Sequence, residues 1–324
     1  MIKNKPNLRK KIVILDGATL NPGDLNWECI EKCGDITIHD RTSESEIKSR
    51  AESAQIILTN KAVIPDNILT ELPNLQYIGV LATGVNVVNC ELAKKLNIVV
   101  SNIPDYGSIS VAQHVFALIL ECSNHIGRHD NAVHNDDWVN CPDFSFTRSP
   151  LIELDGLTLG IFGLGTIGTA TAKIARGFGM NVIAYSRSPK NIPEIKMVSH
   201  NELFESSDFI SLHCPLTEDT QGLINREVLS SMKKSAFLIN TSRGPIINEC
   251  DLAIALKDQT IAGAALDVLY SEPPLANNPL LKAPNCIITP HIAWATQAAR
   301  KRLMSIASQN ITAFQNGSPI NRVN

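Results

Sequence analysis

Three side chains of complementary chemistry lie in the last third of the chain: Arg243, Glu272 and His291. Glu272 comes five residues after Asp267 (272 − 267), and His291 follows a Thr-Pro pair. Each comes just beyond an apolar run expected to be a strand, where open α/β sheets bind ligands. A guanidinium, a carboxylate and an imidazole could together reduce a 2-oxo acid, which requires a hydride at the carbonyl carbon and a proton at its oxygen.

Each of these side chains has an expected role. His291 is the natural proton donor because imidazole titrates near neutral pH. Glu272 could hydrogen-bond the other ring nitrogen, and Arg243 could hold a substrate carboxylate and polarise the carbonyl. Structural roles stay open, because a histidine at a strand end is often only hydrogen-bonded, and Arg243 and Glu272 could form a surface ion pair.

A glycine-rich turn stands in the middle of the chain. An apolar run ending at Phe162 leads into Gly163-Leu-Gly165-Thr-Ile-Gly168, and a helix is expected from Thr166. In this context the first glycine permits a tight turn, the second lets the backbone approach a pyrophosphate, and the third lets helix and strand pack. The free N–H groups of Thr166 and Ile167 would face the anion. The alternative is a glycine-rich turn without a ligand.

The next expected strand indicates which dinucleotide is bound. It ends at Tyr185 and is followed by Ser186-Arg187-Ser188, with no acidic residue before Glu194. NAD sites usually carry an acid here for the ribose 2′-hydroxyl, whereas an arginine and hydroxyls suit a 2′-phosphate. We therefore predict that NADP(H) is favoured and NAD(H) possible, with Asp267 accepting a hydrogen bond from the nicotinamide amide.

Strands alternate with helices on both sides of an unusual segment, Ser108–Ile126, which is apolar on all faces and must be buried. Such alternation predicts an α/β fold of two Rossmann-like domains with mostly parallel sheets. The predicted boundaries are 1–100 together with 291–324 for one domain, and 101–290 for the dinucleotide-binding domain.

Composition narrows the classes of protein. The chain has 324 residues, 44% of them hydrophobic, and 29 basic against 32 acidic residues. This balance argues against a nucleic-acid binder that depends on a strong positive field. No export signal or membrane-length apolar run is found, and the eight cysteines form no CxxC pair. We expect a cytoplasmic protein with reduced, mostly buried thiols, no metal site and no membrane partner.

Several stretches together resemble the D-isomer-specific 2-hydroxyacid dehydrogenases, over nearly the whole chain. The matching stretches are Ala82–Asn86, Ser110–His114, Gly163–Gly168, His213–Thr217, Asn240–Gly244, Ala264–Val268 and Thr289–His291. The opening from Ile14 to Asp24, and Trp138 to Phe146, look most like the glycerate dehydrogenase/hydroxypyruvate reductase branch.

The resemblance implies an active site in the cleft between the two domains, the first of them a flavodoxin-like substrate domain. It assigns Arg243 to substrate binding, Glu272 to support of the histidine, and His291 to acid/base work. Backbone amides near Ala82, Thr83 and Gly84 would hold the substrate carboxylate. Besides Gly163, Gly165 and Gly168, the residues that would line the cofactor are Thr166, Ile167, Ser186, Arg187, His213, Cys214, Pro215, Thr241 and Asp267.

The predicted function is an NAD(P)-dependent oxidoreductase acting on the CH–OH group of a small D-2-hydroxy acid. The expected reaction is reversible reduction of hydroxypyruvate or glyoxylate to D-glycerate or glycolate, and family members are usually homodimers. Two alternatives stay open. One is a dinucleotide-sensing, non-catalytic protein resembling the transcriptional corepressors of this fold, and the other is a reductase of a bulkier 2-oxo acid.

Overall fold

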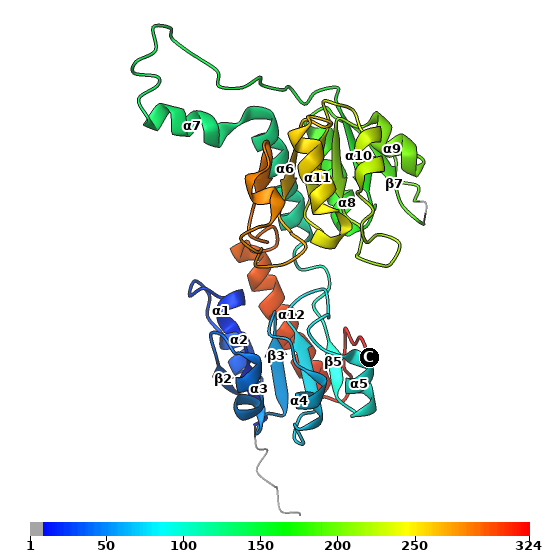
Figure 1. Ribbon diagram of the computed structural model, residues 1–324. Helices are drawn as coiled ribbons and strands as arrows, with labels where there is room; N and C mark the ends of the chain where they lie inside the picture. The colour runs from blue at the N-terminus through cyan, green and yellow to red at the C-terminus, as the bar shows by residue number, and fades with distance from the viewer. Residues whose placement is uncertain (1–8, 189) are drawn as a thin grey trace, which may run out of the picture. The chain divides into compact units, whose positions relative to one another are not determined.

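The computed structural model describes residues 9–188 and 190–324, which divide into two compact units. Unit 1 extends to Gly107 and resumes at Ala295–Asn324, and unit 2 is Ser108–Trp294 (Figure 1). Every pairing between two of the described strands is parallel, which confirms the predicted α/β class. The described residues contain no helix that is both long and apolar enough to cross a bilayer.

Unit 1 contains a parallel sheet whose described strands follow the order β2-β1-β3-β4-β5. Its strands are β1 (Lys11–Ile14), β2 (Asp35–Ile38), β3 (Ile56–Thr59), β4 (Tyr77–Val80) and β5 (Val99–Ser101). Its helices are α1 (Gly17–Leu20), α2 (Glu28–Glu31), α3 (Glu44–Ala51), α4 (Asp66–Thr70), α5 (Cys90–Lys95) and α12 (Gln297–Gln315).

The central strands of unit 1 are buried on both faces, as continuous apolar runs predict for a covered parallel sheet. On one face Val13, Ile57 and Ile78 pack with the apolar sides of α3, α4 and α5. On the other face the C-terminal helix α12 lies against β4, where the rings of Tyr77 and Phe314 are 4.8 Å apart. The last helix of the chain therefore completes the first domain.

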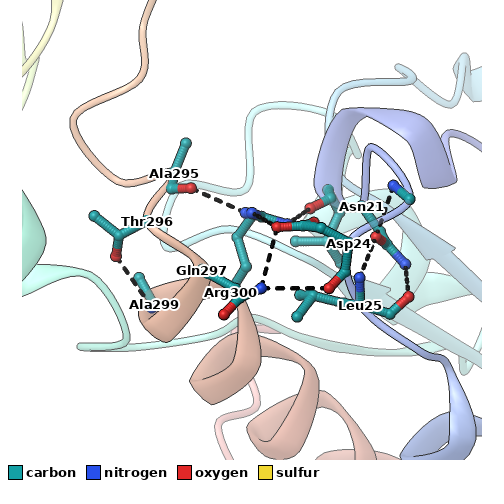
Figure 2. Close-up of polar contacts among 10 residues, drawn as sticks. Asn21, Asp24, Leu25, Ala295, Thr296, Gln297, Ala299 and Arg300 are labelled. Atoms are coloured by element: carbon teal, nitrogen blue, oxygen red, sulfur yellow. Dashed lines mark hydrogen bonds and ion pairs between the residues drawn. The ribbon is translucent and has the colours of Figure 1, made fainter.

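An ion pair fixes the start of α12 to the loop after α1 (Figure 2). The guanidinium of Arg300 donates to both carboxylate oxygens of Asp24, at 2.6 and 2.7 Å, and its Nε donates to the carbonyl of Ala295. These bonds lower the pKa of Asp24 to about 2. Arg300 is only 7% exposed, so Asp24 is needed to compensate its buried charge.

Unit 2 contains a larger parallel sheet, whose described strands follow the order β12-β11-β10-β9-β6-β7-β8. Its strands are β6 (Thr158–Phe162), β7 (Asn181–Tyr185), β8 (Lys196–Met197), β9 (Phe209–Leu212), β10 (Phe237–Asn240), β11 (Gly263–Leu266) and β12 (Cys286–Ile288). Its helices are α6 (Ser108–Asn124), α7 (Ile126–His134), α8 (Thr166–Gly177), α9 (His200–Ser206), α10 (Arg226–Ser231) and α11 (Glu249–Lys257). Two short 3₁₀ turns, Gly244–Ile246 and Pro279–Lys282, complete it.

Helices cover both faces of the sheet in unit 2. On one face α6 and α8 pack together over alternate strand residues such as Leu159, Ile161 and Ile239. On the other face α9, α10 and α11 pack over residues such as Ile210, Leu212 and Leu238. The polar ends of the strands are thereby held at a fixed edge, where the candidate functional residues lie.

Two sequence-based expectations need correction. The polar composition of Asn124–Phe146 favours a loop, but the helix α7 occupies Ile126–His134 within this segment. Several of its residues, including His129 and His134, have polar side chains. The apolar residues are therefore too few to show a clear helical periodicity. All eight cysteines are free thiols, yet only Cys122 and Cys214 are buried, so the expectation of mostly buried thiols is wrong.

Candidate active site

The glycine-rich turn joins β6 to α8 as predicted. Gly163 has φ +101°, a left-handed conformation that L side chains rarely adopt, and a Cβ there would lie 2.8 Å from the nitrogen of Cys214. A Cβ on Gly168 would lie 2.3 Å from the carbonyl oxygen of Gly163. A Cβ on Gly165 would meet no described atom within 4 Å. The first and third glycines are therefore needed by the protein itself, and the second leaves open space at the start of α8.

The start of α8 suits an anion. Gly165 is the N-cap and offers no side chain to the first turn, which contains Thr166 and Ile167 and no acidic residue. The N–H groups of a helix start have no partner within the helix, and the helix dipole favours negative charge there. The turn therefore fits the pyrophosphate of a dinucleotide.

Residues after β9 lie against the same turn, and Thr241 follows the neighbouring strand β10. The backbone of His213 and Cys214 lies against Gly163, and Ser211 Oγ is 2.9 Å from Nε2 of His213. Burial lowers the pKa of His213 to about 4 and raises that of Cys214 to about 11, so both are neutral near pH 7. The hydroxyl of Thr241 is buried and has no hydrogen-bond partner among the described residues. An orphaned hydroxyl at this position fits a polar ligand group.

Ser186 and Arg187 directly follow β7, at the same sheet edge. The N–H of Gly163 donates to the carbonyl of Tyr185 at 2.8 Å, which brings the end of β7 beside the glycine turn. Arg187 is exposed. Glu194, the first acid after the strand, pairs instead with Arg176 at the end of α8. Glu194 is therefore engaged in an ion pair with a residue of α8.

Arg243 lies in a loop after β10, and hydrogen bonds between residues of this loop hold its backbone. The buried side chain of Asn240 accepts from the N–H and hydroxyl of Ser242 at 3.0 and 2.9 Å and donates to the carbonyl of Arg243 at 2.9 Å. Arg243 itself is exposed and donates to the carbonyl of Ser242 at 2.7 Å. The backbone is thus fixed while the guanidinium stays accessible to a substrate carboxylate.

Glu272 and His291 meet as predicted. His291 Nδ1 lies 2.6 Å from Glu272 Oε2, and the N–H of Leu269 donates to the other carboxylate oxygen at 3.2 Å. Because an ionised carboxylate only accepts, Nδ1 carries the proton of this bond, and Nε2 is the ring atom left for proton exchange. The pair is partly exposed, with 26% of the His291 side chain accessible. It has the arrangement of a general acid/base supported by a carboxylate.

Asp267 differs from its predicted role in one respect. Its Oδ1 accepts from the hydroxyl of Thr289 at 2.6 Å and the N–H of Ile292 at 2.9 Å, and its Oδ2 accepts from the N–H of Ala293 at 2.8 Å. Asp267 is 1% exposed. It therefore anchors the loop that carries His291, and a carboxylate oxygen with one bond keeps a second acceptor direction for a ligand amide.

The predicted substrate loop lies in unit 1, after β4. Thr83 Oγ1 donates to the carbonyl of Ile103 at 3.0 Å, and Asn102 Nδ2 donates to the carbonyl of Thr83 at 2.7 Å. The N–H of Ile103 donates to the carbonyl of Ala82. The segment after β5 therefore holds the backbone of Ala82, Thr83 and Gly84 in place.

The chain is similar to known proteins over nearly its whole length. The family described as "D-isomer specific 2-hydroxyacid dehydrogenase, NAD binding domain" matches residues 116–293. Hydroxypyruvate reductase of Blautia hydrogenotrophica is 48% identical over 320 residues, covering 97% of this chain and 99% of that protein. The chain belongs to the D-isomer-specific 2-hydroxyacid dehydrogenases.

Two further relatives place the dehydrogenase in its branch. Glycerate dehydrogenase of Methylorubrum extorquens is 38% identical over 320 residues, covering 98% of this chain and 99% of that protein. The NADPH-dependent glyoxylate/hydroxypyruvate reductase of Sinorhizobium meliloti, solved with NADP and malonate, aligns with a TM-score of 0.83 and 27% identity over 97% of each chain. The dehydrogenase falls in the glycerate dehydrogenase/hydroxypyruvate reductase branch, and it is an oxidoreductase that uses a nicotinamide dinucleotide.

Sequence reasoning gave no role to several residues that build this site of the dehydrogenase. Asn240, Thr289 and His114 lie inside the motifs that carry the family resemblance, but their side chains were not interpreted. Glu249 at the start of α11 accepts from the N–H of Tyr270 and from Asn278, both at 2.8 Å, and so holds the loop of Glu272. An acidic residue in the first turn of a helix is visible in the sequence, but the partners of Glu249 are not, because they lie 21 and 29 residues away in the chain. Among the described residues, no three His, Cys, Asp or Glu side chains could hold a metal ion.

Proposed function

We propose that this dehydrogenase reversibly reduces hydroxypyruvate or glyoxylate to D-glycerate or glycolate. The His291–Glu272 pair, 2.6 Å apart at the carboxyl edge of the dinucleotide-binding sheet, carries the proposal. The 48% identity to a hydroxypyruvate reductase supports the choice of substrate. Unit 2 is the proposed dinucleotide-binding domain, and unit 1 is the proposed substrate domain, with Ala82, Thr83 and Gly84 as its carboxylate-binding segment.

A dinucleotide bound at the glycine turn would supply or accept the hydride. His291 Nε2 gives a proton to the carbonyl oxygen during reduction and takes it back during oxidation. The Glu272 carboxylate keeps Nδ1 protonated and stabilises the positive charge that the ring carries before it donates. Arg243 binds the substrate carboxylate through its planar fork and polarises the carbonyl group. Asn240 and Glu249 hold the loops that carry these groups.

The experiment is a panel of 2-oxo acids assayed with NADH and NADPH, on the wild type and on His291→Ala. We expect turnover of hydroxypyruvate and glyoxylate, and a fall of about 100- to 10,000-fold in kcat for His291→Ala with dinucleotide binding retained. His134→Ala, which removes an exposed histidine from α7, is the matched control. Undiminished turnover by His291→Ala would remove this residue from the mechanism, and no turnover of any 2-oxo acid by the wild type would favour the non-catalytic alternative.

We further propose that NADP(H) is preferred. Ser186 and the exposed Arg187 follow β7 beside the glycine turn, and Glu194 is paired with Arg176 on α8. Arg187→Ala should raise the KM for NADPH about tenfold and change the KM for NADH little, because only the 2′-phosphate needs the guanidinium. Arg226→Ala, at the exposed start of α10, is the control for a lost positive charge. A clear preference of the wild type for NADH would contradict the proposal.

A homodimer is the proposed assembly. The helix α7 and the segment after it present exposed apolar side chains, with Ile126, Val139 and Phe144 being 62%, 82% and 91% accessible. Such a cluster on one segment is typical of a surface buried against another molecule. A second copy is the proposed occupant, because members of the resembled family are usually dimeric. Light scattering should give a dimer for the wild type and a monomer for Phe144→Asp with Val139→Asp; a monomeric wild type would contradict this.

A further inference from the structure

A chain of hydrogen bonds in unit 2 reaches from α6 to the loop that carries His291. His114 Nε2 lies 3.1 Å from Thr289 Oγ1 and 3.5 Å from Asp267 Oδ1. Thr289 Oγ1 lies 2.6 Å from the same oxygen of Asp267. The partners come from different elements, since Thr289 directly follows β12 and Asp267 directly follows β11. The register Leu266↔Ile288 of these neighbouring strands places the last two side by side.

The chemistry of the three groups fixes the direction of the chain. A carboxylate only accepts, so the hydroxyl of Thr289 donates its single proton to Asp267. The hydroxyl oxygen must then accept from His114, which requires a proton on Nε2. The bonds therefore run from His114 to Thr289 to Asp267, and they select the Nε2–H form of the imidazole.

The far end of this chain holds a strained backbone. His291 has φ +55°, in the left-handed region that a histidine occupies at a cost. Its N–H donates to the carbonyl of Asp267 at 2.9 Å, and the next two N–H groups donate to the Asp267 carboxylate at 2.9 and 2.8 Å. A strained conformation persists only where its surroundings over-determine it. The hydrogen bonds to Asp267 supply these constraints as long as its carboxylate cannot rotate.

We propose that His114 is a positioning residue, which acts through Thr289 to fix the Asp267 carboxylate and thereby keeps His291 aligned with Glu272. The inference rests on the proposed function, in which His291 moves the proton. Thr289 already occupies Oδ1 together with Ile292 N–H, so rotation of the carboxylate would break both bonds. Because His114 stands on the helix α6, which packs against α8, the alignment of His291 depends on an element other than the loop that carries it.

Matched pairs of variants test the chain. His114→Gln and Thr289→Ser keep a donor or hydroxyl at each position, whereas His114→Leu and Thr289→Val remove it. We expect kcat to fall about 10- to 100-fold in the second pair, with the substrate KM little changed, because small misplacements of a catalytic group cost rate. The first pair should recover most of kcat. Thermal unfolding checks that all four variants fold.

Nitrogen-15 spectra of histidine-labelled protein give a readout that needs no turnover. His114 should be in the Nε2–H form in the wild type, and the Nδ1–H signal of His291 should persist in Thr289→Ser and broaden in Thr289→Val. A His114 ring protonated only on Nδ1, or equal kcat for Thr289→Val and Thr289→Ser, would overturn the proposal. If the wild type instead turns over no 2-oxo acid, the proposed function fails, whatever the spectra show about the hydrogen-bond chain.

Discussion

The two units share a strand arrangement but differ where their first strands end. In unit 1, β1 lies between β2 and β3, and in unit 2, β6 lies between β7 and β9. The residue after β1 and Leu15 is Asp16, whose carboxylate accepts from the N–H groups of Asn60, Lys61 and Ala62 after β3, at 2.9, 2.5 and 3.0 Å. The residue after β6 is Gly163, which has no side chain and lies against the backbone after β9.

The difference shows what makes a ligand site at this point of the fold. Both sheets open a crevice between the ends of two neighbouring strands, where backbone N–H groups need an acceptor. Unit 1 fills the crevice with a carboxylate of its own chain, and its next helix, α1, is only four residues long. Unit 2 has no side chain at Gly163, leaves open space at Gly165, and follows the turn with the 12-residue helix α8. Under the proposed function, the pyrophosphate of the dinucleotide would bind at the start of α8, whereas unit 1 supplies an acceptor from its own chain.

The largest effect is expected for Asp16→Ala. The variant leaves three N–H groups without their acceptor at a position that is 4% exposed, so the free energy of unfolding should fall by about 2–4 kcal/mol. Asp35→Ala, which removes an exposed carboxylate at the start of β2, is the control. Urea unfolding measures both variants, and an Asp16→Ala protein as stable as Asp35→Ala would show that unit 1 does not depend on this internal anion.

Two variants of the glycine turn in unit 2 should separate an effect on stability from an effect on dinucleotide binding. Gly168→Ala places a methyl group against the carbonyl of Gly163 and should lower the free energy of unfolding by about 1–3 kcal/mol. Gly165→Ala meets no described atom, so it should leave stability unchanged while weakening dinucleotide binding about tenfold or more. Thermal unfolding and a dinucleotide titration of each variant make the measurement. Unchanged affinity in Gly165→Ala would mean that the open space is not the pyrophosphate site.

The smallest expected effects are on the stability of the protein at low pH. The pKa of His213 is about 4 in the folded protein and 6.5 without the fold, so the unfolded state takes up the proton first, and this contribution to stability is lost as the pH falls from 6.5 to 4. For Asp24, with pKa values of about 2 and 3.8, the loss comes below pH 3.8. Acid should therefore remove the contribution of His213 before that of Asp24.

The variants His213→Gln and Asp24→Asn test this order by urea unfolding across the pH range. The stability of His213→Gln should be flatter than that of the wild type between pH 6.5 and 4. The deficit of Asp24→Asn at neutral pH, where Arg300 loses its charged partner, should shrink only below pH 3.8. Parallel pH curves for wild type and both variants would contradict the assignment of these shifts.

The sequence was informative where a property depends on neighbours in the chain. The turn Gly163–Gly168 predicted the strand, the turn and the helix, because each glycine's role is set by its own backbone. The positions of Arg243, Glu272 and His291 after apolar runs predicted a shared sheet edge, because parallel strands end on one side. The helix α7 was missed because its polar residues hide the periodicity that marks a helix.

The sequence by itself determined the α/β class, the family and the chemical types of the functional side chains, since these follow from local patterns and motifs. Only the tertiary structure decided which partner each polar group takes. Asp267 is predicted to accept a hydrogen bond from the nicotinamide amide, and the structure adds that it holds Thr289, Ile292 and Ala293. His114 reaches it from a helix more than 150 residues earlier in the chain (267 − 114 = 153). Hydrogen-bond partners of buried groups depend on distances between elements remote in sequence, and those distances are set by packing.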